Sequence, residues 1–295
     1  GRAPARPARR PSRWRAGTQY AGFLPAAILF GVCFVAPFVL IVVYSFWQTR
    51  NYVLVHDWTW GNYHTILGTG TYVRTFGKTV LIGGLATATT IVLAFPFCYW
   101  LVRHVPPRLQ RVLLILVILP FWTSYLLRVY AWLSILGDNG ALNVALERVG
   151  LIDGPSRFLL YDNPGVFVVL VYLYFPFAAL TLYAALERFD WSLLRAAADL
   201  GARPSVALYR ILLPQLRLPI ATASIFVFIP ILGEYLAPQV VGGTKGVMIG
   251  NLIANFFQGF LLPLGSAASV LIAAVIVLVL VLFRKSLGAS DVYRA

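Results

Sequence analysis

The chain has 295 residues, of which 60% are hydrophobic and 12% charged, and its mean hydropathy is +0.80. This composition excludes a water-soluble globular domain and predicts an integral membrane protein, because so much apolar surface needs lipid around it. The net charge of +14 is weak evidence for nucleic-acid binding, since six of the basic residues lie within the first fifteen positions. A membrane-topology signal explains them better, and no nucleic-acid partner is expected.

Three regions divide the chain. Residues 1–19 are rich in Arg, Pro and Ala, which predicts a disordered basic arm lying against anionic lipid headgroups. Residues 20–285 form the predicted transmembrane domain, and residues 286–295 form a tail. The two cysteines lie in apolar stretches and the three histidines are scattered, so neither type predicts a metal or catalytic site.

Six apolar stretches approach the roughly 20 residues that cross a bilayer as a helix. They are continuous rather than alternating, which favours helices over sheet. The fold class is therefore predicted as an all-α integral membrane protein with six transmembrane helices in one domain. The predicted spans are 23–47, 80–102, 112–136 with polar interruptions, 166–185, 219–236 and 267–283.

The basic residues predict the orientation of these spans. Seventeen of the 24 Lys and Arg residues fall in segments 1–15, 103–111, 186–217 and 284–295, and seven fall elsewhere. Because positive charge is retained on the cytoplasmic side, these four segments are expected to be cytoplasmic. Both termini of this multi-pass membrane protein are then expected to be cytoplasmic.

The loop between the third and fourth spans is acidic and predicts a short amphipathic helix over 141–149, ended by Gly150. The longest cytoplasmic stretch, 187–217, predicts a helix, a turn and a second helix. Asp190 can cap the first helix, Gly201 can end it in a left-handed conformation, and Pro204 can open the second. Ala196, Ala197, Leu200 and Gly201 are spaced to form one small, smooth face suited to docking.

This stretch, RAAADLGARPSVALYRILLP, resembles the cytoplasmic coupling loop of ABC importer permeases, in which EAA is followed by Gly four residues later and then by I-x-L-P. The family's leading Glu is Arg195 here. The segments 119–143 and 233–250 also resemble polyamine-type permeases of this family. The candidate ATPase-coupling residues are Arg195, Ala196, Ala197, Asp199, Leu200, Gly201, Ile211, Leu213 and Pro214.

The resemblance implies the type I importer fold and a complex of two permease subunits, two cytoplasmic ATPase subunits and an extracytoplasmic substrate-binding protein. It also implies that ATP and Mg bind to the ATPase partners and that this chain carries no cofactor. The chain is not expected to be an enzyme, since it shows no nucleophile with a base and no nucleotide-binding glycine loop at the required spacing. The alternative for the loop is an amphipathic helix lying on lipid headgroups.

Polar and aromatic residues at membrane depth are the candidate lining of a substrate pathway. Arg128 either faces a cavity or extends to the interface, since facing lipid at mid-bilayer would cost at least about 2.5 kcal/mol. Glu234 either attracts a passing amine or caps the next segment. Asn251, Asn255 and Gln258 form a polar stripe that faces either the pathway or the second permease. The pathway candidates are Trp122, Tyr125, Arg128, Tyr130, Trp132, Glu234, Asn251 and Asn255.

The aromatic members of this set could equally form a belt at the membrane interface, or bind an organic cation. The resemblance favours spermidine or putrescine as cargo, with an amino-acid-like or opine-like solute as the nearest alternative. Two other functions remain open: a membrane scaffold or sensor that binds a partner through its cytoplasmic helix, and a secondary transporter. The absence of an evident inverted repeat makes the latter less natural.

Overall fold

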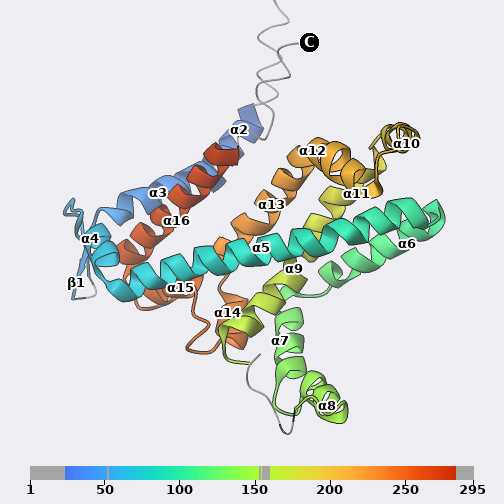
Figure 1. Cartoon of the computed structure of the whole chain (residues 1–295). Coiled ribbons are helices and arrows are strands. Elements are labelled where there is room, and N and C mark those ends of the chain that lie inside the picture. Colours follow the sequence, from blue (N-terminus) through green and yellow to red (C-terminus); the bar gives the residue numbers. More distant parts are fainter. Residues whose placement is uncertain (1–23, 52, 153, 155–159, 284–295) are drawn as a thin grey trace, which may run out of the picture.

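The computed structural model describes residues 24–51, 53–152, 154 and 160–283 of the chain. The predicted basic arm and tail lie outside the described residues. Most of the described chain is helical (Figure 1). In chain order the elements are α2 (Leu24–Phe30), η1 (Gly31–Val35), α3 (Ala36–Ser45), β1 (Gln48–Arg50), β2 (Val53–Val55), α4 (Gly61–Gly68), α5 (Gly70–His104), α6 (Pro107–Ile118), η2 (Leu119–Trp122), α7 (Tyr125–Leu136), α8 (Ala141–Arg148), α9 (Asn163–Glu187), α10 (Ser192–Asp199), α11 (Pro204–Ala207), η3 (Leu208–Leu212), α12 (Leu213–Gln215), α13 (Arg217–Leu232), α14 (Leu236–Val241), α15 (Ile249–Gln258) and α16 (Leu262–Phe283).

Four helices are each long and apolar enough to cross a membrane: Leu24–Ser45, α5, α9 and α16. Two further spans are bent pairs, which raises the number to six if each pair is one crossing. The predicted count of six therefore depends on the two broken spans. α5 is longer than the span predicted at 80–102. It begins at Gly70, ten residues earlier, and continues to His104.

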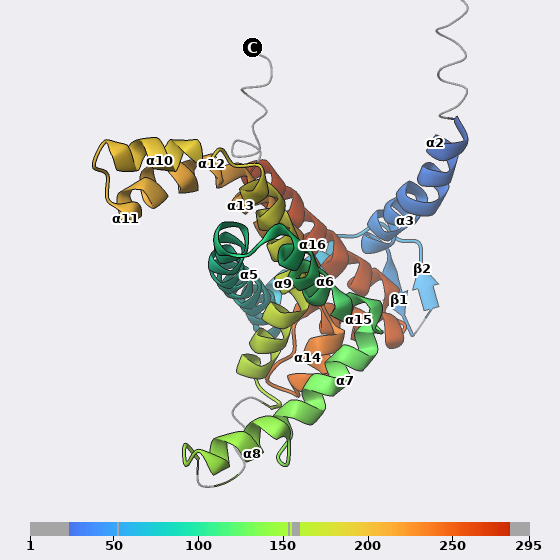
Figure 2. The same cartoon turned by 90° about the vertical axis from the view of Figure 1, so that its right-hand side faces the viewer.

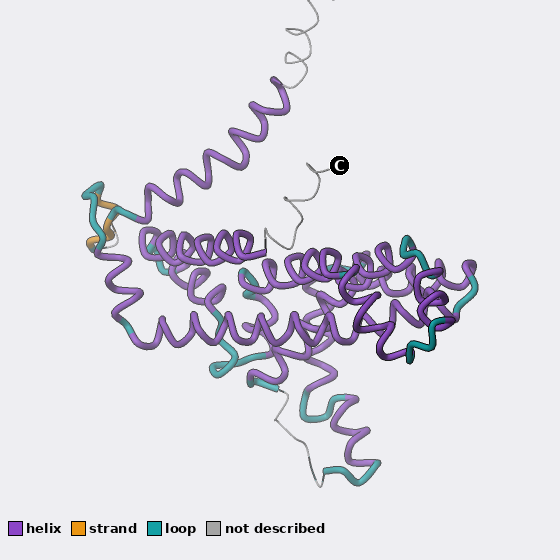
Figure 3. Tube along the Cα trace, turned by 45° about the horizontal axis from the view of Figure 1, so that its top comes forward, coloured by secondary structure: helices purple, strands orange, loops and turns teal. Residues whose placement is uncertain are grey.

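The first span is almost fully exposed within this chain. None of the residues in its most apolar stretch is buried by the rest of the chain. Its main contact is with α16. Figures 2 and 3 show it diverging from the other helices. An apolar helix with bare sides needs lipid or another membrane subunit around it.

The centre of the bundle is formed where α5 packs against α9 and α13. One face of α5 is lined by small buried residues three or four positions apart, namely Gly83, Ala86, Thr90, Ala94 and Cys98. Such residues allow helix backbones to approach closely in a membrane. The Cys98 thiol donates to the carbonyl of Ala179 in α9 at 3.2 Å, consistent with a packed structural role.

The third predicted span is not one helix. The segment formed by α6 and η2 meets the segment from α7 to Arg148 at 96°. Pro120 lies in the tightened turn η2, and Thr123 and Ser124 take extended conformations before α7 begins. Since proline cannot donate to the helical ladder, the turn weakens just where the direction changes. A similar bend of 66° separates the segment Pro204–Gln215 from α13.

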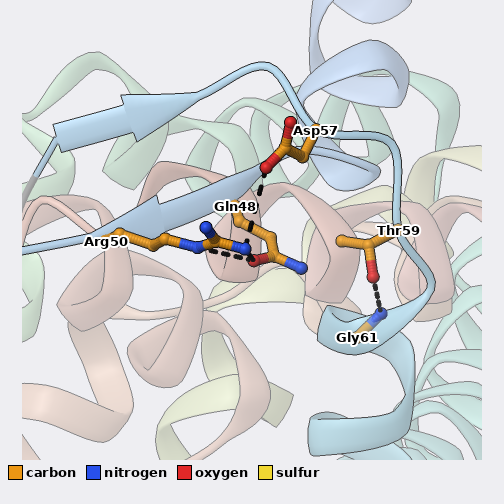
Figure 4. Close-up of polar contacts among 5 residues, drawn as sticks. All are labelled: Gln48, Arg50, Asp57, Thr59 and Gly61. Carbon is orange, nitrogen blue, oxygen red and sulfur yellow. Dashed lines mark hydrogen bonds and ion pairs between the residues drawn. The ribbon is translucent and has the colours of Figure 1, made fainter.

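A β-hairpin is the one departure from an all-α fold among the described residues. β1 pairs with β2 in antiparallel register, directly after the first span. The Arg50 guanidinium donates to Gln48 Oε1 at 3.2 and 3.3 Å and lies 3.7 Å from Asp57 Oδ2 (Figure 4). Thr59 Oγ1 accepts from the Gly61 N–H at 3.0 Å, where α4 begins.

Polar contacts also fix the loop between α14 and α15. Lys78 donates to the carbonyl of Lys245 at 2.7 Å, and Lys245 Nζ lies 3.4 Å from Asp162 Oδ2. Asp162 caps α9 by accepting from the Asn163 N–H at 2.7 Å. That hydrogen bond, with help from the nearby lysines, lowers the pKa of Asp162. The loop is thereby tied to the starts of both α5 and α9.

Candidate functional site

The loop 187–217 has the predicted helix, turn and helix. Asp190 Oδ1 accepts from the backbone N–H of Ser192 at 2.9 Å and from its hydroxyl at 2.6 Å, which fixes the start of α10. These hydrogen bonds lower the pKa of Asp190, so its carboxylate is charged at neutral pH. The capping role predicted for Asp190 is confirmed, although helix α10 itself begins at Ser192.

The end of α10 is also as predicted. Gly201 has a φ of +80°, and its N–H donates to the Ala198 carbonyl at 2.9 Å. The next N–H, of Ala202, donates to the Ala197 carbonyl at 2.9 Å. A left-handed residue at this position closes a helix with little strain only if it is glycine. Pro204 then opens α11, as expected.

The predicted smooth face of α10 is divided in the structure. Ala196, Leu200 and Gly201 are exposed, with Leu200 89% exposed, but Ala197 is buried within the chain. The prediction that all four residues form one docking face is therefore wrong for Ala197. α10 packs against α11 and η3, and that packing covers one side of so short a helix.

The remaining motif residues lie on both sides of this small assembly. Arg195 and Asp199 are exposed beside Leu200. Ile211 and Leu213 are half-buried, and Pro214 is exposed. Between them Leu212 is fully buried and anchors η3 to the core. The exposed candidates for contact with a partner are therefore Arg195, Ala196, Asp199, Leu200, Gly201 and Pro214.

Aromatic residues connect this loop to the membrane helices. The sequence analysis did not predict this connection. The Trp191 ring lies 5.9 Å from that of Tyr99 and 5.1 Å from that of Phe189, measured between centroids. The Arg103 guanidinium lies 4.9 Å above the Trp191 ring. Tyr99 and Arg103 are one turn apart near the end of α5. The start of α10 is thus held against the end of the longest membrane helix.

A second cluster of polar residues lies where α13 ends and α14 begins, next to α9. Glu234 is 7% exposed, and its Oε2 accepts from the Tyr174 hydroxyl at 2.9 Å. Its Oε1 accepts from the N–H groups of Leu236 and Ala237 at 3.0 and 3.4 Å. Glu234 therefore caps α14, one of the two roles considered from the sequence. Tyr174 was not predicted, although it stands in an aromatic run before Pro176 of α9.

Arg128 lies in the lining of a cavity, one of the two positions considered from the sequence. Its guanidinium lies 4.6 Å from the centroid of the Phe121 ring and 5.6 Å from that of Tyr125. Arg128 and Trp132 help to line a cavity of about 460 Å³ between α6, α7 and α9. The Phe121 ring packs on that of Phe177 at 5.1 Å between centroids, and Phe177 contacts Tyr174, the hydrogen-bond donor to Glu234. We refer to five of these residues as the arginine cluster: Phe121, Tyr125, Arg128, Tyr174 and Glu234.

Two polar atoms in the arginine cluster are buried without a hydrogen-bond partner in the described part of the chain. They are the Nε of Arg128 and the hydroxyl of Tyr125. Groups of this kind are costly unless something else engages them. The cluster is thus open to a further polar contact.

The other pathway candidates are not part of the arginine cluster. Trp122 and Tyr130 are 86% and 48% exposed, as expected for an aromatic belt or a subunit contact. Asn251 is buried, where it accepts from the Met248 N–H at 3.0 Å and donates to the Tyr235 carbonyl at 2.7 Å. Asn255 is exposed. The predicted stripe is therefore divided, because Asn251 is used to cap α15.

Comparisons with known proteins agree with this architecture. Residues 90–289 match the family described as binding-protein-dependent transport system inner membrane component. The spermidine/putrescine transport system permease protein PotB of Escherichia coli (strain K12) is 34% identical over 203 residues, which cover 68% of this chain and 73% of that protein. PotB of Haemophilus influenzae is 32% identical over 216 residues, covering 73% and 75% of the two chains.

A third relative is the inner membrane ABC transporter permease protein YdcU of Escherichia coli (strain K12), 35% identical over 225 residues that cover 72% of this chain and 71% of that protein. Among solved structures, a chain of a bacterial alginate ABC transporter in complex with an alginate pentasaccharide-bound periplasmic protein superposes with a TM-score of 0.76. That match is 18% identical and covers 93% of this chain and 96% of the other, so it shows the type I importer permease fold alone. The chain belongs to the family of binding-protein-dependent transport system inner membrane components, as a permease subunit of ABC importers.

Proposed function

We propose that the chain forms half of the translocation pathway of a bacterial importer for polyamines such as spermidine or putrescine. The cargo class rests on the spermidine/putrescine relatives, together with a buried carboxylate among aromatic rings. Carboxylates and π-faces are the groups that attract ammonium ions at low dielectric. The single observation that carries the proposal is Glu234, buried in a family whose named relatives handle polyamines.

The complex would contain a second permease subunit, two ATPase subunits that bind ATP and Mg, an extracytoplasmic binding protein and surrounding lipid. Support for the binding protein comes from the alginate transporter, which was solved with a periplasmic protein. Support for an ATPase contact comes from the loop itself. Its outward residues include small and charged ones together with the apolar Leu200, and the loop stands away from α8 at the other end of the molecule (Figures 1 and 2).

We also propose that both termini are cytoplasmic. Topology reporters inserted after Arg15, near Arg108, near Pro204 and after Arg294 should read cytoplasmic, and those near Gly61, Pro155 and Lys245 should read exterior. The physical reason is the concentration of basic residues in the four predicted cytoplasmic segments. Alkaline phosphatase and green fluorescent protein fusions measure the two states. Reversal at any two sites would contradict the six-span arrangement.

Cargo charge is tested by Glu234→Gln. We expect polyamine uptake by the reconstituted complex to fall about tenfold or more, since interactions with a charged group contribute about 1.5–3 kcal/mol. The amide keeps the shape and an acceptor for the Leu236 N–H, so assembled complex should remain near its normal abundance. Radiolabelled uptake and co-purification give the two quantities.

Tyr174→Phe is the matched control, because it removes the 2.9 Å hydrogen bond but keeps the Glu234 carboxyl group. It should reduce uptake less than Glu234→Gln does. Loss of assembly in proportion to uptake would assign Glu234 only its capping role. Unchanged uptake in Glu234→Gln would contradict the polyamine proposal.

A carboxylate-bearing cargo, such as an amino-acid-like or opine-like solute, is the second candidate. The observation in its favour is the buried Arg128 Nε without a partner among the described residues, since guanidinium groups bind carboxylates well. Competition decides between the two cargo classes. Excess spermidine or putrescine should inhibit uptake if the cargo is a polyamine, whereas only amino-acid-like solutes should inhibit it in the second case.

A further inference from the structure

The arginine cluster already contains a cation. The Arg128 guanidinium lies over the Phe121 and Tyr125 rings at 4.6 and 5.6 Å. The Phe121 ring packs on Phe177, and Phe177 in turn contacts Tyr174, which donates to Glu234. A free ammonium group entering this region would seek the same rings and the same carboxylate. Arg128 therefore occupies the environment that suits an organic cation.

Arg128 is held there incompletely. Its Nε has no hydrogen-bond partner in the described segments, and both Glu234 oxygens already accept from other groups. Its contacts with the rings are cation–π contacts, which are individually weak. A side chain bound in this way can be displaced by a competing cation at modest cost.

The helix that carries Arg128 begins at a sharp break in the chain. α7 begins immediately after the extended residues Thr123 and Ser124, at the 96° bend that separates it from α6. Phe121 belongs to the segment before the bend and Tyr125 to the segment after it. The Arg128 guanidinium thus joins two segments across a break, beside a cavity of about 460 Å³ that it helps to line.

We propose that Arg128 is a resident cation that occupies the ammonium site formed by Phe121, Tyr125 and Glu234, and that an incoming organic cation must displace it. The ligand class is a small molecule with an ammonium group. The inference rests on the proposed function for the identity of the cargo, but the charge preference of the site can be measured without any cargo. Displacement would release the contact between the segments on either side of the bend.

The first test measures that preference directly. Cys33 and Cys98, the cysteines of the chain, are replaced by Ala, and Arg128→Cys is introduced into the full complex in membranes. A trimethylammonium methanethiosulfonate should modify the new thiol at least about tenfold faster than a sulfonate-bearing one, after correction for their rates with a free thiol. Adding Glu234→Gln should abolish most of the difference.

Equal rates, a faster anionic reagent, or no reaction with either reagent would each overturn the proposal. These outcomes do not depend on which solute is imported. They therefore separate failure of the resident-cation site from failure of the polyamine proposal, which is judged by uptake in the unmodified complex.

The second test compares Arg128→Gln with Arg128→Lys by polyamine uptake. Removing the resident cation in Arg128→Gln should lower the half-saturating cargo concentration about tenfold, as expected for loss of a competitor in a cleft of opposite charge. Arg128→Lys keeps a displaceable cation and should shift that concentration less. A rise in the half-saturating concentration in Arg128→Gln, at equal abundance of complex, would show that Arg128 binds cargo rather than competes with it.

Discussion

Gly201→Asp should nearly abolish cargo-stimulated ATP hydrolysis and uptake in the assembled transporter, while leaving the membrane abundance of the chain close to normal. Two effects combine at this residue. The φ of +80° is strained for any L-residue, and an aspartate also places a negative charge on the exposed end of α10, where the ATPase is proposed to dock.

The structure shows why the chain itself should still fold when Gly201 is replaced by Asp. A Cβ at Gly201 would meet no atom within 4 Å, and the residue is exposed. The cost to folding is thus confined to the backbone, about 1–2 kcal/mol. By contrast, an uncompensated charge buried in a subunit interface is strongly unfavourable. The expected defect is in coupling, not in stability.

Gly201→Asn is the matched control, because asparagine bears a similar backbone cost in the left-handed conformation and has nearly the same shape as aspartate without the charge. It should retain substantially more coupled hydrolysis than Gly201→Asp. The measurement is ATP hydrolysis and uptake by proteoliposomes containing all subunits. If Gly201→Asp keeps both activities, α10 lies on lipid headgroups, the alternative considered for this loop.

Much of the membrane fold was accessible from hydropathy. The spans predicted at 166–185 and 267–283 fall within α9 and α16, because continuous apolar runs of this length have few other structures available. The span predicted at 112–136 was wrong as a single helix. Its break depends on two extended residues after Pro120, and a hydropathy average does not register the backbone conformation of two residues.

The coupling loop was predicted well because its signals are local. Asp190, Gly201 and Pro204 each act within a few residues of themselves, through a cap, a left-handed end and a helix start. The burial of Ala197 was missed, since it depends on how α10 packs against α11 and η3. Periodicity identifies which residues share a face, but not what covers that face.

The polar residues predicted to line the pathway show more strongly that a sequence pattern does not reveal which groups a side chain contacts. Glu234 and Asn251 were predicted as pathway candidates from their unusual location, and the structure gives both of them capping contacts with nearby backbone groups. Tyr174, the partner of Glu234, lies sixty residues earlier in the chain. A contact over that separation has no signature in one sequence.

Gly250→Ala is expected to be strongly damaging for a single-methyl substitution, with a large loss of correctly folded protein. Gly250 is buried in the first turn of α15, and a Cβ there would lie 2.4 Å from the Glu234 carbonyl oxygen. Carbon and oxygen atoms do not approach so closely, so the helix or the 233–235 turn would have to shift. Overpacking of this kind costs about 1–3 kcal/mol and occasionally more.

The neighbouring contacts prevent an easy shift. Asn251 holds the turn by donating to the Tyr235 carbonyl at 2.7 Å, and Glu234 Oε1 accepts from the Leu236 N–H at 3.0 Å. Moving the Glu234 carbonyl away would strain both contacts and would also displace the carboxylate of the arginine cluster. The effect should therefore be at the upper end of the range, about 3 kcal/mol.

Gly77→Ala provides the matched control, since Gly77 is an exposed residue of α5 and its Cβ would meet nothing within 4 Å. Alanine at such a helical site should be neutral or stabilising by up to about 1 kcal/mol. Fluorescence-detected size-exclusion chromatography after heating in detergent gives the fraction of each variant that remains monodisperse. Gly250→Ala should lose its monodisperse peak at a markedly lower temperature than Gly77→Ala and the unmodified chain. Equal thermal profiles for the two variants would mean that α15 can move away from the 233–235 turn, and that the close approach at Gly250 is not what positions Glu234.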